Sequence, residues 1–163
     1  MSAALPAAPL EVDRAQIATA LHWDHERLDG LERAAFDAWA EGDLAEARAA
    51  FGRFARGLRR HIGLEETLVF PELDRRVGAG ASPELRTASL RSEHRQILAL
   101  VAAIELAVRS DAVPIRLLRR HLRELLTAHS RKEDQVLYPL VDSLLRPDER
   151  GIILRRIELL PEQ

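Results

Sequence analysis

Four long stretches of this chain repeat apolar residues at intervals of three and four, the spacing that lines one face of an α-helix. These stretches cover residues of about 13–40, 44–75, 83–108 and 118–140. Only short segments separate them, so each helix must run antiparallel to the one before it. The pattern therefore predicts an all-α protein, folded as an up-down-up-down antiparallel four-helix bundle.

Turn-forming residues lie between the four stretches. The first stretch ends at Glu41-Gly42-Asp43, and the Asp43 side chain can cap the helix that follows. The chain is expected to turn again over residues 78–83 and 110–114, each of which contains Ser and Pro. These three positions are the predicted connections of the bundle.

Three prolines mark the later parts of the bundle helices. Pro71 and Pro139 lie late in the second and fourth stretches, where a proline should kink or end a helix. Pro147 should stop the fourth helix. Beyond it, residues 148–160 include six aliphatic side chains, too many for a solvated end. We expect residues 147–163 to form a short C-terminal helix or tail, packed on the bundle or on a second copy in a homodimer.

Composition narrows the class of protein further. A chain of 163 residues is one ordinary domain, which we place at residues 13–146. It has no cysteine, so any metal must be held by histidines and carboxylates. A net charge of −2 gives no general attraction to nucleic acid or to an anionic membrane, and no apolar run approaches the ~18–20 residues of a membrane span. Residues 1–12 lack the basic and apolar regions of a secretory signal, so we interpret them as a disordered tail on a cytoplasmic protein.

Four of the histidines belong to a pattern that occurs twice. In each copy an acidic residue precedes a first histidine, and a second histidine follows 36 or 35 residues later. A glutamate comes four residues after the second histidine, and an aromatic-proline pair ends the copy. The first copy consists of Asp24-His25, His61, Glu65-Glu66 and Phe70-Pro71, and the second of Glu93-His94, His129, Glu133-Asp134 and Tyr138-Pro139. The histidines and the first glutamate of each copy fall within the apolar series, so the bundle should bury them.

Buried carboxylates are the reason to expect a metal. A charge in a protein core is unfavourable unless it is paired or coordinates a metal. A His and a Glu four residues apart project from one helix face about 6 Å apart along the axis, so each pair can reach one cation. The predicted metal ligands are His25, His61, Glu65, His94, His129 and Glu133. Imidazole and carboxylate without sulfur suit iron, manganese or zinc, and two carboxylates shared between two cations suit a pair of irons.

The order of these residues resembles that of the hemerythrin-like, or HHE cation-binding, family over residues of about 15–145. The resemblance implies a four-helix bundle with two non-haem iron ions, bridged by Glu65 and Glu133; zinc or manganese could substitute. Family members include oxygen carriers, oxygen or redox sensors, iron-handling domains and di-iron proteins linked to nitric oxide stress and iron–sulfur repair. Oxygen carriers have a fifth histidine four residues after the third-helix histidine, and that position is Leu98 here. The chain therefore looks more like the nitric oxide and repair branch.

Two functions follow from this interpretation. In the first, the site binds or senses a small diatomic ligand, O2 or NO. In the second, the chain is a di-iron enzyme or an iron-handling protein in nitric oxide or oxidative stress, or in iron–sulfur cluster repair. The positions one turn from the ligands offer no general acid or base, so no catalytic residue is assigned. These apolar positions are Leu28, Leu58, Leu68, Ile97, Leu98, Leu125 and Val136.

Several polar residues near the predicted ligands have open roles. Glu66 and Asp134 are expected to accept hydrogen bonds from ligating imidazoles, or else to be surface charges. His22, one turn before the first ligand, could replace the missing fifth histidine. Tyr138 is the only tyrosine and lies more than two turns beyond His129, which argues against a tyrosyl-radical role.

The remaining charged and aromatic residues have simpler interpretations. Arginines cluster at residues 53–60 and 116–123, and the second half of the first helix is acidic. Ion pairs between helices explain these charges more simply than an anionic partner does. His121 is expected at the surface or partly buried. The predicted core or helix-contact aromatics are Trp23, Phe36, Trp39 and Phe54.

Overall fold

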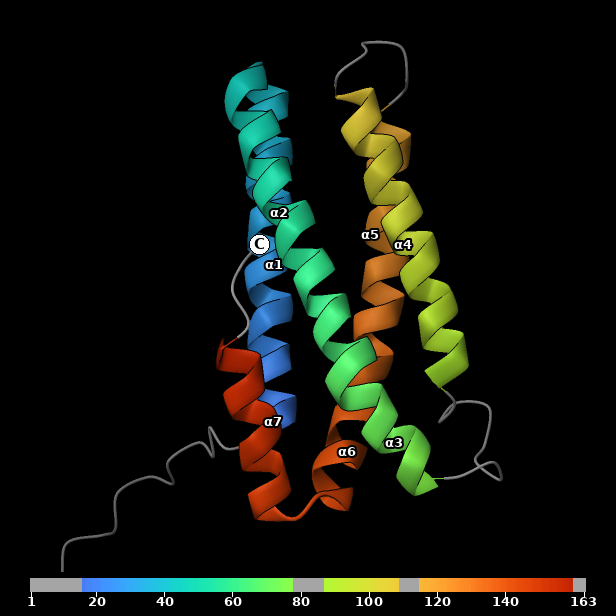
Figure 1. Cartoon of the computed structure of the whole chain (residues 1–163). Coiled ribbons are helices and arrows are strands. Elements are labelled where there is room, and N and C mark those ends of the chain that lie inside the picture. Colours follow the sequence, from blue (N-terminus) through green and yellow to red (C-terminus); the bar gives the residue numbers. More distant parts are fainter. Residues whose placement is uncertain (1–15, 78–86, 109–114, 160–163) are drawn as a thin grey trace, which may run out of the picture.

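The computed structural model describes residues 16–77, 87–108 and 115–159, and every regular element in these ranges is a helix (Figure 1). The helices are α1 (Ile17–Glu41), α2 (Leu44–Leu64), η1 (Glu65–Val69), α3 (Phe70–Val77), α4 (Thr87–Ala107), α5 (Ile115–Lys132), η3 (Glu133–Leu137), α6 (Tyr138–Leu144) and α7 (Pro147–Leu159). η1 and η3 are single π-helical turns that join α2 to α3 and α5 to α6. Four long antiparallel helices and a short C-terminal helix result, which confirms the predicted fold. None of the described helices is long and apolar enough to cross a membrane.

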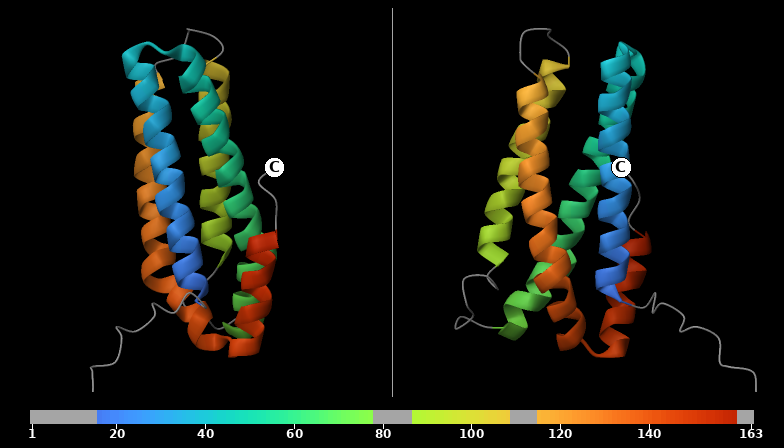
Figure 2. Two further views of the ribbon diagram at one scale, coloured as in Figure 1. Left: turned by 90° about the vertical axis from the view of Figure 1, so that its left-hand side faces the viewer. Right: turned by 180° about the vertical axis from the view of Figure 1, so that it is seen from behind.

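The long helices form two hairpins. α1 packs mainly against α2, and α4 against α5, while α3, α6 and α7 gather at one end of the bundle (Figures 1 and 2). Gly42 ends α1 with a left-handed φ of 84°, and Asp43 accepts a hydrogen bond from the backbone N–H of Glu46 at 3.0 Å. The predicted cap of α2 is therefore confirmed. The predicted turns at residues 78–83 and 110–114 lie outside the described residues, as does the tail at the N-terminus.

The two π turns change the register of the second and fourth bundle helices. Each turn ends shortly before a proline, Pro71 or Pro139, and the helix continues beyond it, so neither proline ends its helix. A π turn contains more residues than an α turn, so the residues that follow it face the core one position later in the sequence than a regular α-helix would place them. Leu137 is buried, whereas Val136 is 45% exposed. The expectation that Val136 lines the site was wrong for this reason.

Two apolar clusters fill the bundle, one on each side of the level at which the histidines lie. The larger cluster includes Leu28, Phe54, Leu58, Ile97 and Leu122. The smaller cluster includes Leu21, Phe70, Leu73, Tyr138 and Ile153. The predicted ligands therefore lie between two tightly packed layers, which hold the helices at fixed separations.

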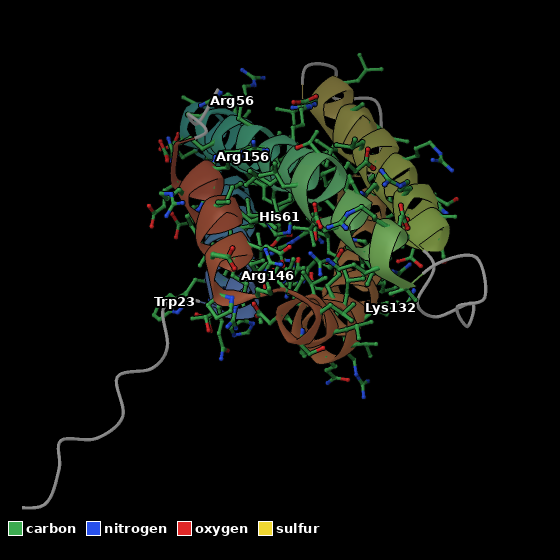
Figure 3. All side chains as sticks on the ribbon, turned by 60° about the horizontal axis from the view of Figure 1, so that its bottom comes forward. Trp23, Arg56, His61, Lys132, Arg146 and Arg156 are labelled. Atoms are coloured by element: carbon green, nitrogen blue, oxygen red, sulfur yellow. The ribbon has the colours of Figure 1, made fainter. Side chains whose placement is uncertain are left out.

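Three of the four aromatic residues assigned to the core are there. Phe36 and Phe54 are buried, and Trp39 packs against the larger cluster. Trp23 is 66% exposed and points away from the bundle (Figure 3). The prediction for Trp23 was wrong because this residue follows buried Leu21 by two positions, roughly 200° around the helix.

α7 packs on its own bundle. Ile153 is buried in the smaller cluster, and Leu154 and Ile157 pack against that cluster. Arg60 of α2 donates a hydrogen bond from Nη2 to the backbone oxygen of Ile157 at 2.7 Å. The short C-terminal helix is thus confirmed, while a homodimer contact through it stays a prediction.

Ion pairs join the helices in the larger-cluster half of the bundle. Glu32 of α1 is buried and accepts hydrogen bonds from Arg119 at 3.0 Å and Arg123 at 3.2 Å, both on α5. Arg59 of α2 pairs with Glu105 of α4 at 2.7 Å. These pairs fit the sequence interpretation of the arginine clusters, except that the carboxylate of α1 pairs with α5 instead of α2.

Candidate metal centre

All six predicted ligands meet at one level of the bundle. They are His25 from α1, His61 from α2, Glu65 from η1, His94 from α4, His129 from α5 and Glu133 from η3. Five of these residues are 4% exposed or less, and the side chain of His25 keeps 11% exposure. Both glutamates are the first residues of π turns, so the same local structure places each of them.

Carboxylates predicted to lie near the site hold two of the histidines. His25 Nδ1 lies 3.1 Å from Asp134 Oδ1, and His94 Nδ1 lies 2.9 Å from Glu66 Oε1. In both cases the carboxylate follows a predicted ligand in the sequence and reaches a histidine of the other copy. The sequence analysis expected Glu66 and Asp134 either to accept hydrogen bonds from ligating imidazoles or to be surface charges. The structure shows the first of these roles.

Two further carboxylates hold the other histidines, and the sequence analysis assigned them no role. His61 Nδ1 lies 3.0 Å from Asp24 Oδ2, and His129 Nδ1 lies 2.8 Å from Glu93 Oε2. Burial opposes ionisation of Asp24, but bonds from His61 and Arg27 lower its pKa to about 2. The sequence did contain a signal for Asp24 and Glu93, because each of them directly precedes the first histidine of its copy of the pattern.

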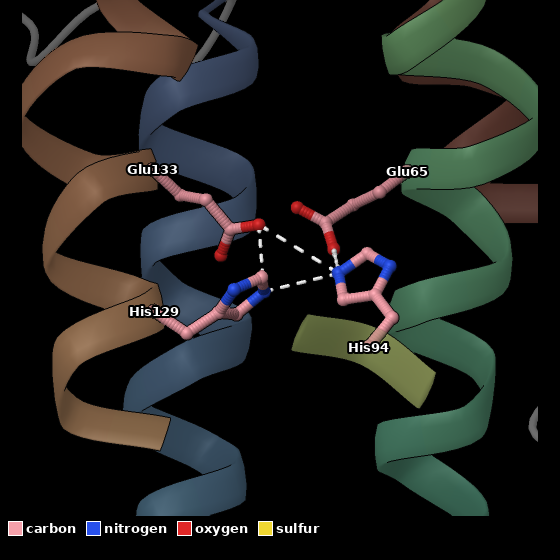
Figure 4. A group of neighbouring side chains, drawn as sticks. All are labelled: Glu65, His94, His129 and Glu133. Atoms are coloured by element: carbon pink, nitrogen blue, oxygen red, sulfur yellow. Dashed lines mark hydrogen bonds and ion pairs between the residues drawn. The ribbon is translucent and has the colours of Figure 1, made fainter. Parts of the chain in front are cut away.

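These outer bonds decide which nitrogen of each imidazole faces inward. Donation from Nδ1 to a carboxylate leaves Nε2 of a neutral imidazole with a lone pair. The Nε2 atoms of His94 and His129 face each other at 3.0 Å (Figure 4). Two lone pairs at this distance repel each other unless a proton or a cation lies near them. Carboxylate-held imidazoles with a free inner nitrogen are typical of metal-binding histidines.

Each glutamate lies between two histidines of different helices. Glu133 Oε1 is 2.9 Å from His129 Nε2, and its Oε2 is 3.4 Å from His25 Nε2. Glu65 Oε2 is 3.2 Å from His94 Nε2 and 3.6 Å from His61 Nε2. Both carboxylates can therefore contribute to two neighbouring cations.

The donor atoms fall into two overlapping groups that could each hold a metal ion. The first group consists of Glu65, His94, His129 and Glu133, and the second of His25, His61 and Glu133. Each residue offers one imidazole nitrogen or carboxylate oxygen, and within a group these atoms lie within 4.8 Å of one another. Bonds of about 2.0–2.2 Å from nitrogen and carboxylate oxygen to one central ion fit this spacing.

The buried carboxylates are also short of hydrogen-bond donors. Among the described residues, none donates a hydrogen bond of proper geometry to Glu65 Oε2 or to either oxygen of Glu133. Such oxygens in a protein core carry a large desolvation penalty, which a metal cation would offset. The donor set therefore fits a cation of the kind that imidazole and carboxylate prefer.

The charges of the site are strongly coupled. Burial disfavours the charged form of His94, but the nearby Glu133 and Glu65 outweigh burial and raise the pKa of His94 to about 10. The same balance raises the pKa values of His25 and His129 above their ordinary value. Burial would raise the pKa of Glu133, yet its histidine neighbours hold it well below the usual range. Without a metal, protons on the imidazoles therefore neutralise the carboxylates.

Tyr138 lies inside the site, a position that the sequence analysis did not predict. Its Oη donates to Glu65 Oε1 at 2.6 Å and lies 3.4 Å from the Nε2 atoms of both His25 and His61. The backbone N–H of Tyr138 bonds to the oxygen of Glu133, five residues earlier, so the π turn brings the ring toward the glutamate's face. Burial, together with Glu65 and Glu133, raises the pKa of Tyr138 well above its ordinary value.

Other residues considered as ligands lie elsewhere. His22 has a side chain that is 53% exposed, and its Nδ1 lies 3.1 Å from the outer oxygen Oδ2 of Asp134. It therefore braces an orienting carboxylate and does not supply a fifth inner histidine. Leu98 packs against the larger cluster, and His121 is exposed as expected.

A cavity of about 20 Å³ adjoins the site on the side of the larger cluster. Most of its lining is apolar, and three predicted ligands contribute to it; the lining residues are His25, Leu28, Asp29, Phe54, Leu58, His61, Ile62, Ile97, Leu126, His129 and Ser130. Its volume suits one or two water-sized molecules. Three of the predicted apolar neighbours, Leu28, Leu58 and Ile97, line it. Leu125 packs against the larger cluster and Leu68 against the smaller one.

The fold and the site together define a helix bundle with buried clusters of histidine and glutamate that could hold a metal ion. Residues 16–148 match the family described as hemerythrin HHE cation binding domain, and the chain belongs to this family. Comparisons with curated proteins and with solved structures find no match. Family membership and the buried clusters of His and Glu imply a metal ion at this centre.

Proposed function

We propose that the chain is a non-haem di-iron protein that binds or senses a small diatomic ligand, O2 or NO. The observation that carries this proposal is the convergence of four imidazoles on two buried carboxylates that lack sufficient donors. His94 and His129 would hold one iron, and His25 and His61 the other. Glu65 and Glu133 would be shared between them.

The choice of iron rests on the donor set and on the expected ligand. Imidazole and carboxylate donors suit iron, manganese or zinc, and the chain has no cysteine to favour softer metals. Bound iron would supply a redox-active centre with positions open to a diatomic ligand. Zinc or manganese could occupy the same residues without that chemistry.

The cavity beside the site supports a small and neutral ligand. Its walls are apolar side chains next to three of the imidazoles, and its volume of about 20 Å³ excludes most organic substrates. Asp29, which is exposed, and Ser130, which is partly exposed, lie in the lining and mark its side toward solvent. A diatomic gas needs no polar groups to orient it, whereas an organic substrate does.

The test begins with metal content, measured by elemental analysis of protein purified anaerobically from iron-replete cells. We expect about two irons per chain, with most of the metal lost in the separate variants Glu65→Ala and His129→Ala. His121→Ala is the matched control, because it removes an exposed histidine of α5 and should retain both irons. Stoichiometric zinc, or full iron retention in His129→Ala, would contradict the proposal.

Ligand titration then separates binding from turnover. A binding or sensing protein should saturate at a fixed ratio of O2 or NO to iron pairs. The alternative, a di-iron enzyme or iron-handling protein in nitric oxide or oxidative stress, or in iron–sulfur repair, should consume ligand continuously or release its iron. Continuous consumption in the presence of a reductant would favour the alternative.

A further inference from the structure

The aromatic residues of the two copies of the pattern differ by one hydroxyl group inside the site. Phe70 ends the first copy and Tyr138 ends the second, each nine residues after a predicted ligand. The ring of Phe70 stacks on His94 with centroids 5.4 Å apart, and the ring of Tyr138 lies beside His25 at 5.7 Å. The two aromatic rings thus occupy equivalent places, but only Tyr138 adds a hydroxyl group.

That hydroxyl lies where a ligand of one metal would lie. Two ligands that are each about 2.1 Å from one ion, at angles of 90–110°, are roughly 3.0–3.4 Å apart. Oη of Tyr138 lies 3.4 Å from His25 Nε2 and 3.4 Å from His61 Nε2. It is therefore spaced from both imidazoles as a third ligand of the same ion.

A purely structural role for the phenol explains less of this geometry. A hydrogen bond to Glu65 alone would require only the contact of 2.6 Å to Oε1. In the metal-free site the two imidazoles are also within hydrogen-bond distance of Oη, and the same equal spacing would let the three atoms share one cation once the imidazoles lose their protons. Phenol oxygen is also an established donor to iron in proteins.

We propose that Oη of Tyr138 is a ligand of the iron held by His25 and His61. This inference rests on the di-iron function proposed above. The phenol loses its proton to solvent when it coordinates the ion. The iron held by His94 and His129 has no equivalent ligand, because Phe70 occupies that place. With both glutamates shared, that iron would therefore have one protein ligand fewer than its neighbour.

The test is spectroscopic and uses the full chain after anaerobic loading and oxidation to the ferric form. Coordinated phenolate gives ferric iron a visible charge-transfer band with tyrosine vibrations in its resonance Raman spectrum. Tyr138 is the only tyrosine, so such a band has only one source in the chain. We expect the band in the wild type and its complete loss in Tyr138→Phe. Phe70→Leu is the control for disturbed packing and should keep the band.

Iron content, measured on every sample, separates failure of this inference from failure of the proposed function. Two irons without a phenolate band in the wild type would overturn the assignment of Tyr138 and leave the di-iron function intact. A band that persists in Tyr138→Phe would overturn it as well. Loss of the band in that variant supports the assignment, whether two irons remain or one is lost. A wild type that takes up no iron would refute both proposals.

Discussion

Replacement of Asp24 by alanine tests the view that outer carboxylates orient the imidazoles. Asp24 lies outside the ring of predicted ligands and contacts the site only through His61, whose Nδ1 is 3.0 Å from Oδ2. The variant removes this acceptor and leaves all six predicted ligands in place. His61 then loses both its fixed orientation and the negative charge behind it. We expect weaker binding of the ion held by His25 and His61.

The expected size of the effect follows from the burial of the contact. Loss of a carboxylate behind a metal-bound histidine typically lowers metal affinity 10–100-fold, or about 1.4–2.7 kcal/mol. The Asp24 side chain is only 13% exposed, so water replaces the lost acceptor poorly, and we expect the upper part of this range. Asp24→Asn keeps an oxygen that can accept from Nδ1 but removes the charge. The metal affinity of Asp24→Asn should therefore fall by about tenfold or less.

Anaerobic zinc titration against a chromophoric chelator measures both sites without redox chemistry. Asp24→Ala should weaken one of the two binding steps and leave the other unchanged, since Glu66 and Glu93 hold the two histidines of the other ion. Asp37→Ala, an exposed carboxylate on the same helix, is the matched control. If both steps in Asp24→Ala stay within twofold of the wild type, the outer carboxylate does not control ligand orientation.

Three further predictions concern stability. The raised pKa of His94, about 10 against 6.5 unfolded, contributes stability to the metal-free protein that is fully present below pH 6.5 and is lost as pH rises through 10. Melting curves in chelator should therefore show a falling Tm from pH 6.5 to 10, and a rising Tm over this interval would contradict the assignment. Glu32→Ala removes the buried partner of Arg119, whose partly exposed guanidinium can still reach water, so denaturant titration should show a loss of about 1–3 kcal/mol; a loss below 0.5 kcal/mol would mean that the pair contributes little. Trp23→Ala should change the free energy of unfolding by less than about 0.5 kcal/mol, because the ring is exposed, and a larger loss would place it in a contact within the chain.

The sequence predicted the bundle and the six residues that meet in it. Periodicity reports which face of a helix is buried, and this depends mainly on the residues of that helix. The repeated spacing of His61 to Glu65, and of His129 to Glu133, placed both pairs on buried faces, where the structure has them. Asp43 was found as a cap for the same reason, since capping is a local interaction.

The sequence did not predict where the periodicity itself changes. A regular α-helix would put Tyr138 roughly 140° around the axis from Glu133, which is away from the site. The π turn joins these two residues by a backbone hydrogen bond and turns the ring inward, and it moves Val136 outward. Neither side chain alone signals a π turn, so the sequence analysis counted Val136 among the apolar neighbours of the ligands and assigned Tyr138 no place in the site.

The sequence by itself determined that four amphipathic helices form and that their buried faces carry imidazoles and carboxylates, because both properties are set along single helices. The tertiary structure decided which acid holds which imidazole. His61 is held by an acid of its own copy of the pattern, and His25 by an acid of the other copy. Such pairings depend on how far each helix is rotated and shifted against its neighbours, and only the packing of the whole bundle fixes those quantities.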